Sequence, residues 1–262
     1  MSRIGSLFGS YAAVPVVKGP RIRLGMAWGA AITLGFLLGE GAIAVLFALT
    51  ATIAALQTSL RWGEAGASGN QILAGVGAGA VVVAAWIGNV IFGLGVVGLV
   101  IASLVFPTGF SFDTTVAVRK RASMAWPTLA AAVPVAIAGG AVVQVDRIDA
   151  LAFVFLATAV CVYDAGDFLC TGGRRKPWLG PVWGMGGVGV VAVTLAIAQP
   201  PPFDSSEAAV VGAILVLACP AGQLFASWLL PRARSHAPAL RRLDAWLLAA
   251  PVVLFGAWIA QP

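Results

Sequence analysis

Two aspartates, Asp164 and Asp167, lie three residues apart near the end of an apolar stretch and are followed by Arg174, Arg175 and Lys176. If a helix continues through the aspartates, both carboxylates share one helical face, because residues three apart are neighbours on a helix. Paired carboxylates can bind Mg²⁺ together with water and phosphate oxygens, and the cationic side chains can neutralise phosphate charge. The simpler alternative is a helix end followed by an ordinary basic loop at a membrane surface.

A second group of charged residues precedes the last apolar stretch of the chain. Asp244 lies at the start of that stretch, where the positive end of a helix dipole favours a carboxylate. It could serve only as a helix N-cap, or it could bind a metal or a substrate, and the sequence leaves both roles open. The same segment carries one histidine, which we interpret as a bystander, among several arginines: Arg232, Arg234, His236, Arg241 and Arg242.

The elements that position these residues are expected to be membrane-spanning helices. Hydrophobic residues make up 60% of the 262 residues and charged residues 10%, and the mean hydropathy is +0.96, which leaves too little polar surface for a soluble globular protein. The sequence therefore predicts an all-α integral membrane bundle of about nine transmembrane helices. The expected apolar segments cover residues 24–38, 41–60, 71–88, 90–106, 124–143, 150–163, 181–198, 208–230 and 245–260.

The distribution of basic residues predicts the orientation of this bundle. With a cytoplasmic N-terminus, every lysine and arginine except Arg147 falls in a cytoplasmic segment, as the positive-inside rule requires. We therefore expect a multi-pass protein of the cell (cytoplasmic) membrane that does not bind nucleic acid. Residues 1–262 form a single membrane domain in this interpretation, with a cytoplasmic N-terminal segment at 1–23 and cytoplasmic loops at 164–180 and 231–244 that form the candidate site.

Two matches to the G-x-G-x-x-G pattern do not indicate a dinucleotide site. The first consists of Gly93, Gly95 and Gly98, and the second of Gly184, Gly186 and Gly189. A dinucleotide fingerprint needs a preceding strand and a βαβ unit, whereas these glycines lie inside long apolar stretches. Small residues that let membrane helices approach closely are the ordinary explanation.

Taken together, the charged segments resemble the signatures of the phosphatidate cytidylyltransferase family, also called CDP-diacylglycerol synthases. In that family an Asp-containing helix end leads to a K-T-W-E-G stretch, and here Asp164 leads to a K-P-W-L-G stretch at residues 176–180. The family's G-D-L-x-x-S signature corresponds to G-Q-L-F-A-S at residues 222–227, and its L-D-R-x-D-S signature to L-R-R-L-D-A at residues 240–245. An A-A-P segment at residues 249–251 completes the likeness.

This sequence also departs from the family pattern at charged positions. Gln223 stands in place of the Asp of G-D-L, and Arg241 in place of the Asp of D-R. The family's Lys-Asp pair and its Gly-His-Gly-Gly turn are absent, and Gln57 stands where the family often has Glu. Of the family's acidic positions, only Asp164 and Asp244 carry over.

The resemblance implies a nucleotidyltransferase of phospholipid biosynthesis, which transfers a cytidylyl group from CTP to phosphatidate at the cytoplasmic face with Mg²⁺ as cofactor. For that reaction we expect Asp164, Asp167 and Asp244 to bind metal, although Asp167 is an acid that the family pattern does not require. We expect Lys176, Arg241 and Arg242 to contact phosphate and Ser227 to be an auxiliary hydrogen-bond donor.

Two other function classes stay open at this stage. One is a catalytically lapsed family member that binds anionic lipid or a partner protein. The other is a transporter, which would need ionisable residues near the bilayer midplane. The glycine-rich helices could mediate a homodimer or could pack within one chain.

Overall fold

The computed structural model describes residues 21–67, 69–107, 118–171, 178–199, 201–232 and 235–261, and these residues contain helices and no strand. The all-α prediction is therefore confirmed. The helices are α2 (Arg21–Leu38), α3 (Glu40–Glu64), α4 (Gln71–Ile87), α5 (Asn89–Val105), α6 (Val118–Ile148), α7 (Ala150–Thr171), α8 (Leu179–Ala198), α9 (Ser205–Leu229), α10 (Leu240–Leu243) and α11 (Trp246–Ala260).

Each expected apolar segment contains one helix. Six of these helices, α3, α6, α7, α8, α9 and the continuous segment Leu240–Ala260, are long and apolar enough to cross a membrane, while α2, α4 and α5 contain shorter apolar helices. The chain is thus a multi-pass membrane protein by the length and composition of its helices. Both G-x-G-x-x-G matches lie inside helices, α5 and α8, and not in a loop after a strand. The packing explanation holds for only two of the six glycines, because a Cβ atom at Gly184 would lie 2.7 Å from the Tyr163 ring and one at Gly95 would lie 3.4 Å from Ala84. A Cβ atom at any of the other four would meet nothing within 4 Å.

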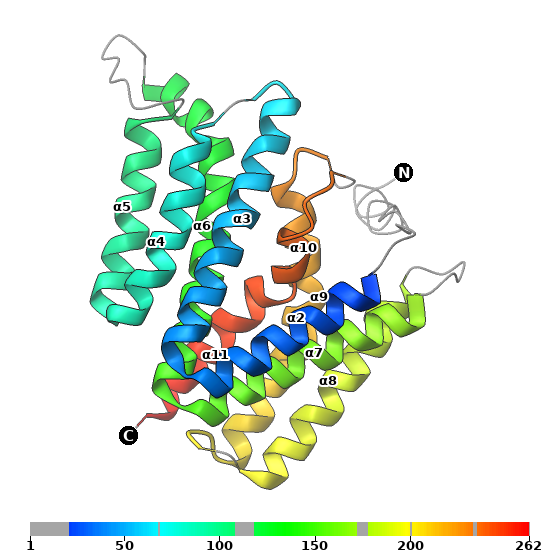
Figure 1. Cartoon of the computed structure of the whole chain (residues 1–262). Coiled ribbons are helices and arrows are strands. Elements are labelled where there is room, and N and C mark those ends of the chain that lie inside the picture. The colour runs from blue at the N-terminus through cyan, green and yellow to red at the C-terminus, as the bar shows by residue number, and fades with distance from the viewer. Residues whose placement is uncertain are drawn as a thin grey trace.

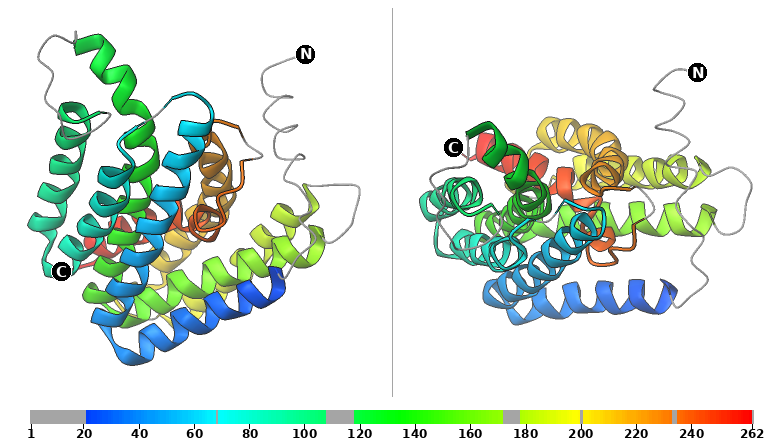
Figure 2. Two further views of the ribbon diagram at one scale, coloured as in Figure 1. Left: turned by 45° about the horizontal axis from the view of Figure 1, so that its top comes forward. Right: turned by 90° about the horizontal axis from the view of Figure 1, so that it is seen from above.

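The helices run back and forth between two ends of the bundle (Figure 1). The α2–α3, α4–α5, α6–α7 and α8–α9 connections lie toward the bottom of Figure 1, and the opposite ends of these helices point toward its top and right side. In both views of Figure 2, α7 and α8 run side by side and are inclined to α3, α4, α5 and α6. The two charged segments therefore belong to the same end of the bundle.

Helix α6 forms the centre of the bundle because its small residues allow close packing. It contacts α3, α4, α5, α7 and α11. A Cβ atom at Gly139 would lie 2.8 Å from Val82 of α4, and one at Gly140 would clash with the ring of Phe92 of α5. Helix packing in membranes depends on such small interface residues, so the G-G pair explains how two helices approach α6 at one level.

The outer faces of the bundle are apolar, as a lipid environment requires. Leu37, Val90 and Ile197 are each more than 70% exposed although they lie on apolar helices. Exposed apolar patches of this extent mark a surface that contacts lipid or another protein.

At the end opposite the charged segments, Arg147 has a structural role. Its Nη1 donates to the carbonyl oxygen of Ala85 at 3.1 Å, and Gln144 Nε2 donates to the same oxygen at 2.6 Å. Both side chains therefore satisfy the C-terminal turn of α4, where carbonyl groups lack helical partners. This contact explains why an arginine occurs at position 147, although every other lysine and arginine is expected in a cytoplasmic segment.

Candidate functional site

The two aspartates of the first charged segment lie on one continuous helix. The apolar stretch was expected to end at residue 163, but α7 continues to Thr171. Asp164 and Asp167 thus share a helical face, as their spacing predicted, and residues 164–171 belong to a helix rather than to a loop. Lys176 lies outside the described residues.

The junction of α10 and α11 brings Asp244 to these aspartates. Asp164 interacts electrostatically with Asp244, Asp167 and Arg242, and Asp244 interacts with Arg241, Arg242 and Asp167. Three carboxylates and two guanidinium groups from segments about 80 residues apart therefore occupy one region. We refer to Asp164, Asp167, Arg241, Arg242 and Asp244 as the charged cluster.

The N-cap explanation of Asp244 is wrong. Its backbone is helical, with φ −60° and ψ −48°, and the N-cap position of α11 is Ala245, which has no side-chain cap. The Asp244 side chain is 7% exposed, and its Oδ1 accepts a hydrogen bond from the Ala245 N–H at 2.8 Å. The expected loop at 231–244 is also partly helical, because α10 occupies its last turn.

Helix α9 connects the two halves of the charged cluster through Gln223 and Ser227. The Tyr163 hydroxyl donates to Gln223 Oε1 at 2.9 Å, and Gln223 Nε2 donates to Asp167 Oδ2 at 3.3 Å. Arg241 Nη1 donates to the Ser227 hydroxyl at 2.9 Å, and that hydroxyl donates to the Gln223 carbonyl oxygen at 3.0 Å. Gln223 thus orients an acid on α7, and Ser227 orients an arginine on α10.

A close backbone approach brings α9 against the α10–α11 junction. A Cβ atom at Gly222 would overlap the carbonyl oxygen of Asp244 and lie 3.2 Å from that of Ala245. Gly222 is therefore required where the two segments touch, because any side chain would separate them. Gly222, the glycine of the G-Q-L stretch, therefore has a packing role in addition to matching the sequence signature.

Three side chains of α3 bind the backbone that leads into α10. Gln57 Oε1 accepts from the Ala239 N–H at 3.0 Å, Arg61 Nε donates to the His236 carbonyl at 2.9 Å, and Trp62 Nε1 donates to the Leu229 carbonyl at 2.9 Å. Sequence reasoning noted Gln57 only as a departure from a pattern and missed Arg61 and Trp62. Their partners are backbone groups, which leave no signal in residue types.

The charged cluster is consistent with a bound cation that takes only part of its ligands from the protein and the rest from water and substrate. Among the described residues, no three His, Cys, Asp or Glu side chains are grouped so that they alone could hold a metal ion. Mg²⁺, however, usually takes one or two carboxylates and completes its shell with water and substrate phosphates. The donor chemistry of Asp164, Asp167 and Asp244 fits that second type of site.

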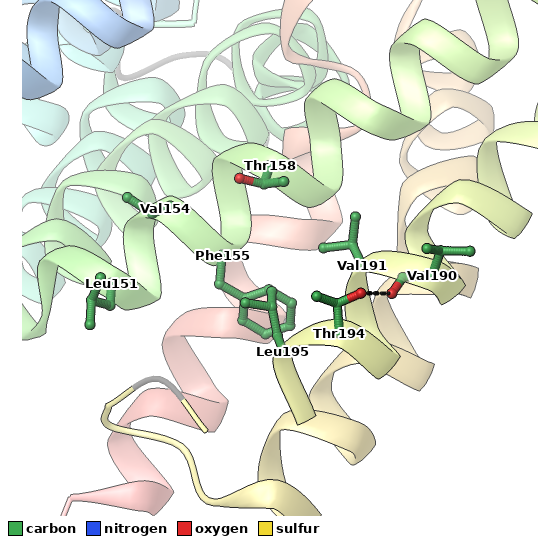
Figure 3. Close-up of a pocket in the computed structure, with 8 residues that line it drawn as sticks. All are labelled: Leu151, Val154, Phe155, Thr158, Val190, Val191, Thr194 and Leu195. Carbon is green, nitrogen blue, oxygen red and sulfur yellow. Dashed lines mark hydrogen bonds between the residues drawn. The ribbon is translucent and has the colours of Figure 1, made fainter. Parts of the chain in front are cut away.

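Two cavities of the bundle lie away from the charged cluster. One, of about 210 Å³, lies between α7 and α8 and is lined by apolar residues and by Thr158 and Thr194 (Figure 3). The Thr194 hydroxyl donates to the Val190 carbonyl at 2.9 Å, so it is satisfied within its own helix. A second cavity, of about 690 Å³, lies between α9 and α11 and is also mainly apolar. Such linings suit acyl chains rather than polar substrates.

Comparison of the chain with protein families, curated proteins and solved structures gives no match.

Proposed function

We propose that this protein is a divergent CDP-diacylglycerol synthase-like transferase that moves a cytidylyl group from CTP to phosphatidate at the cytoplasmic membrane face. The observation that supports it is the convergence of Asp164 and Asp167 with Arg241, Arg242 and Asp244. These residues lie in the two segments that resemble the family signatures. Phosphoryl chemistry needs such a mixture, because carboxylates hold Mg²⁺ while guanidinium groups contact phosphate oxygens.

The proposed topology has nine crossings, with the N-terminus and the charged cluster on the cytoplasmic side. Arg61, Arg241 and Arg242 belong to the cluster end of the bundle, and Arg147 belongs to the other. Alkaline phosphatase fused after Ile148 should be active, because that position is external in this topology, whereas a fusion after Thr171 should be inactive. The reverse activities would refute the orientation.

In the proposed reaction, an oxygen of the phosphatidate phosphate attacks the α-phosphorus of CTP. A new phosphorus–oxygen bond forms, the bond from the α-phosphorus to the bridging oxygen breaks, and pyrophosphate leaves with that electron pair. Arg241 and Arg242 would neutralise the phosphate oxygens as charge moves to the leaving group. Mg²⁺ bound by one or two of Asp164, Asp167 and Asp244 would supply further charge neutralisation.

Two neighbouring side chains would position these groups. Ser227 accepts from Arg241 Nη1 and so orients one guanidinium face. Gln223 donates to one carboxylate oxygen of Asp167 and is itself oriented by Tyr163. A small displacement of reacting groups can lower a rate about 100-fold, so these contacts matter even without touching the substrate.

The test is transfer of label from CTP to phosphatidate by purified protein with Mg²⁺. We expect turnover in the unaltered protein and its loss in Asp164→Asn and Asp244→Asn. Asp149→Asn is the matched control, because Asp149 Oδ1 caps the N-terminus of α7 at the other end of that helix, and Asn caps helices equally well. Turnover that survives both Asp164→Asn and Asp244→Asn would exclude the proposed site.

The presence of Gln223 favours one alternative function, in which the protein is a lapsed family member and binds anionic lipid without turnover. An amide stands at the position of a family acid, and it bridges Tyr163 and Asp167. An amide oxygen carries no charge and is a weaker cation ligand than a carboxylate. Phosphatidate binding with no transfer from CTP would support this alternative over the transferase.

A further inference from the structure

The short segment that leads into α10 is held by two side chains of α3. We refer to residues 235–239 as the entry segment, because α10 begins directly after it. Gln57 Oε1 accepts from the Ala239 N–H at 3.0 Å, and Arg61 Nε donates to the His236 carbonyl at 2.9 Å. Both contacts therefore fix backbone atoms that lie within six residues of the arginines of the charged cluster.

The two contacts together specify the register of the entry segment. Gln57 and Arg61 lie four residues apart on α3, so they share one helical face and lie about 6 Å apart along it. One side chain accepts from an N–H, and the other donates to a carbonyl three residues earlier in the chain. A shift of the entry segment by one residue would break both hydrogen bonds, so the pair sets the position of the chain at this point.

Glu64 orients Arg61 for its contact. Arg61 Nη1 lies 2.7 Å from both carboxylate oxygens of Glu64. An arginine and a glutamate three residues apart on a helix are neighbours, and the planar guanidinium holds its donors in a fixed arrangement. The ion pair on one side of the guanidinium therefore keeps Nε directed at the His236 carbonyl on the other.

Gln57 also replaces a cap that α10 lacks. The N-cap position of α10 is Ala239, which has no side-chain cap, and the first N–H groups of a helix have no partner within it. Gln57 supplies an acceptor from another helix. Only the oxygen of its amide can accept from an N–H, so the contact also fixes the orientation of that amide. The start of α10 thus depends on α3.

Other contacts of α10 should keep this helix folded without Gln57. Leu240 and Leu243 are both 0% exposed, so the opposite side of the short helix is anchored in the core. Arg241 and Arg242 lie between these leucines, in the first turn after the entry segment. Loss of an α3 contact should therefore displace this turn, and with it both guanidinium groups, rather than unfold the helix.

We infer that Gln57 and Arg61 are positioning residues of the proposed transferase, which fix the start of α10 so that Arg241 and Arg242 are held where phosphate binds. The inference rests on the proposed function for the phosphate that these arginines contact. It adds to that function a part of α3 that contacts no substrate and acts only through the backbone of the entry segment.

The first experiment compares Gln57→Leu with the unaltered protein in the transfer of label from CTP to phosphatidate. Leucine has a similar size but offers no acceptor to the Ala239 N–H. A displacement of about 1 Å can lower a rate about 100-fold, so we expect kcat to fall by about 10- to 100-fold. The control is Thr50→Val on the same helix, because the Thr50 hydroxyl donates within α3, to the Leu46 carbonyl at 2.7 Å.

Gln57→Glu distinguishes positioning from general destabilisation. A carboxylate oxygen also accepts from an N–H, and it is favoured at the positive end of a helix dipole. This variant should therefore recover most of the kcat that Gln57→Leu loses, while the thermal midpoints of Gln57→Leu and Thr50→Val stay similar. Equal kcat values for Gln57→Leu and Thr50→Val would overturn the inference, and so would a kcat for Gln57→Glu as low as that of Gln57→Leu.

Arg61→Met tests the second contact at a side chain that is 31% exposed, where a substitution leaves the core intact. It should also lower kcat, and its effect combined with that of Gln57→Leu should be smaller than the product of the two single effects, because either loss already releases the entry segment. Multiplicative effects would contradict a joint action of the two residues. If Gln57→Leu does not fold, Arg61→Met decides the matter, and an unchanged kcat would overturn the inference.

Two readouts separate the inference from the proposed reaction. Backbone hydrogen exchange at residues 237–242 needs no substrate, and it should be faster in Gln57→Leu but not in Gln57→Glu or Thr50→Val; unchanged exchange in Gln57→Leu would refute the inference whether or not transfer occurs. If the unaltered protein binds phosphatidate without transfer, weaker binding in Gln57→Leu that Gln57→Glu restores would support the positioning of the arginines and refute the transferase. Absence of both transfer and phosphatidate binding would refute both.

Discussion

Gly222→Ala should separate the two halves of the charged cluster. The added Cβ would overlap the Asp244 carbonyl oxygen and would also lie 3.3 Å from the Asp244 carbonyl carbon. Because both partners are backbone atoms, no rotamer change can remove the overlap. Ordinary carbon contacts are about 3.5–4.0 Å, so α9 and the α10–α11 junction would have to move apart by about 1 Å.

Two measurable losses follow from that displacement. Overpacking of this kind costs about 1–3 kcal/mol, which should lower the thermal stability of the purified protein. Asp244 and Arg241 would also move relative to α9, and a displacement of about 1 Å can reduce a rate about 100-fold. Transfer of label from CTP to phosphatidate measures the second effect.

Gly186→Ala is the matched control for this prediction. Gly186 also lies inside a helix, and a Cβ there would meet nothing within 4 Å. Alanine is favoured over glycine in a helix by about 1 kcal/mol, so this variant should be as stable as the unaltered protein or more so. If Gly222→Ala behaved like Gly186→Ala in stability and activity, the close approach of α9 to the α10–α11 junction would be refuted.

Three further predictions test the contacts around the site. Tyr163→Phe and Gln223→Leu should show a coupling energy of about 1 kcal/mol in a double-mutant cycle of unfolding, and additive effects would contradict the Tyr163–Gln223 hydrogen bond. Trp62→Phe should make the 230–239 segment more sensitive to proteolysis than the exposed control Trp183→Phe, because Trp62 fixes the start of this segment through the Leu229 carbonyl and Trp183 does not contact it; equal sensitivity would refute that role. At the opposite end of the bundle, hydrogen bonds from Glu207 N–H and Ser206 lower the pKa of Asp204, so its stabilising effect is present above its unfolded pKa of about 3.9 and is lost as the pH falls through the lower folded value. The stability difference between the unaltered protein and Asp204→Ala should therefore narrow on acidification below about pH 4, and a constant difference would contradict the capping role.

The fold could be predicted from the sequence because hydrophobic stretches of sufficient length leave few alternatives to membrane helices. The helix ends could not. Hydropathy falls after Tyr163, yet α7 continues to Thr171, and the part of it that could cross a membrane extends to Cys170. Similarly, Asp244 resembles an N-cap in sequence, but α10 and α11 are joined by two residues with helical backbone angles.

The candidate site was only partly predictable. The spacing of Asp164 and Asp167 was sufficient to place them on one face, and the likeness to a known signature suggested that Asp244 would join them. No pattern suggested the contacts of Trp62 or Arg61, because a backbone carbonyl is the same in every residue.

The charge balance of the cluster explains why a cation belongs to the proposed function. Asp164, Asp167 and Asp244 bring three carboxyl groups, and Arg241 and Arg242 bring two guanidinium groups. A lipid phosphate adds further negative charge, and like charges 4 Å apart near a protein surface repel by about 4 kcal/mol. Phosphatidate binding should therefore weaken when Mg²⁺ is removed by a chelator. An acid at position 223 would add a fourth carboxylate beside Asp167. Because Gln223 is an uncharged amide, the site needs less positive charge from a cation than it would need with that acid.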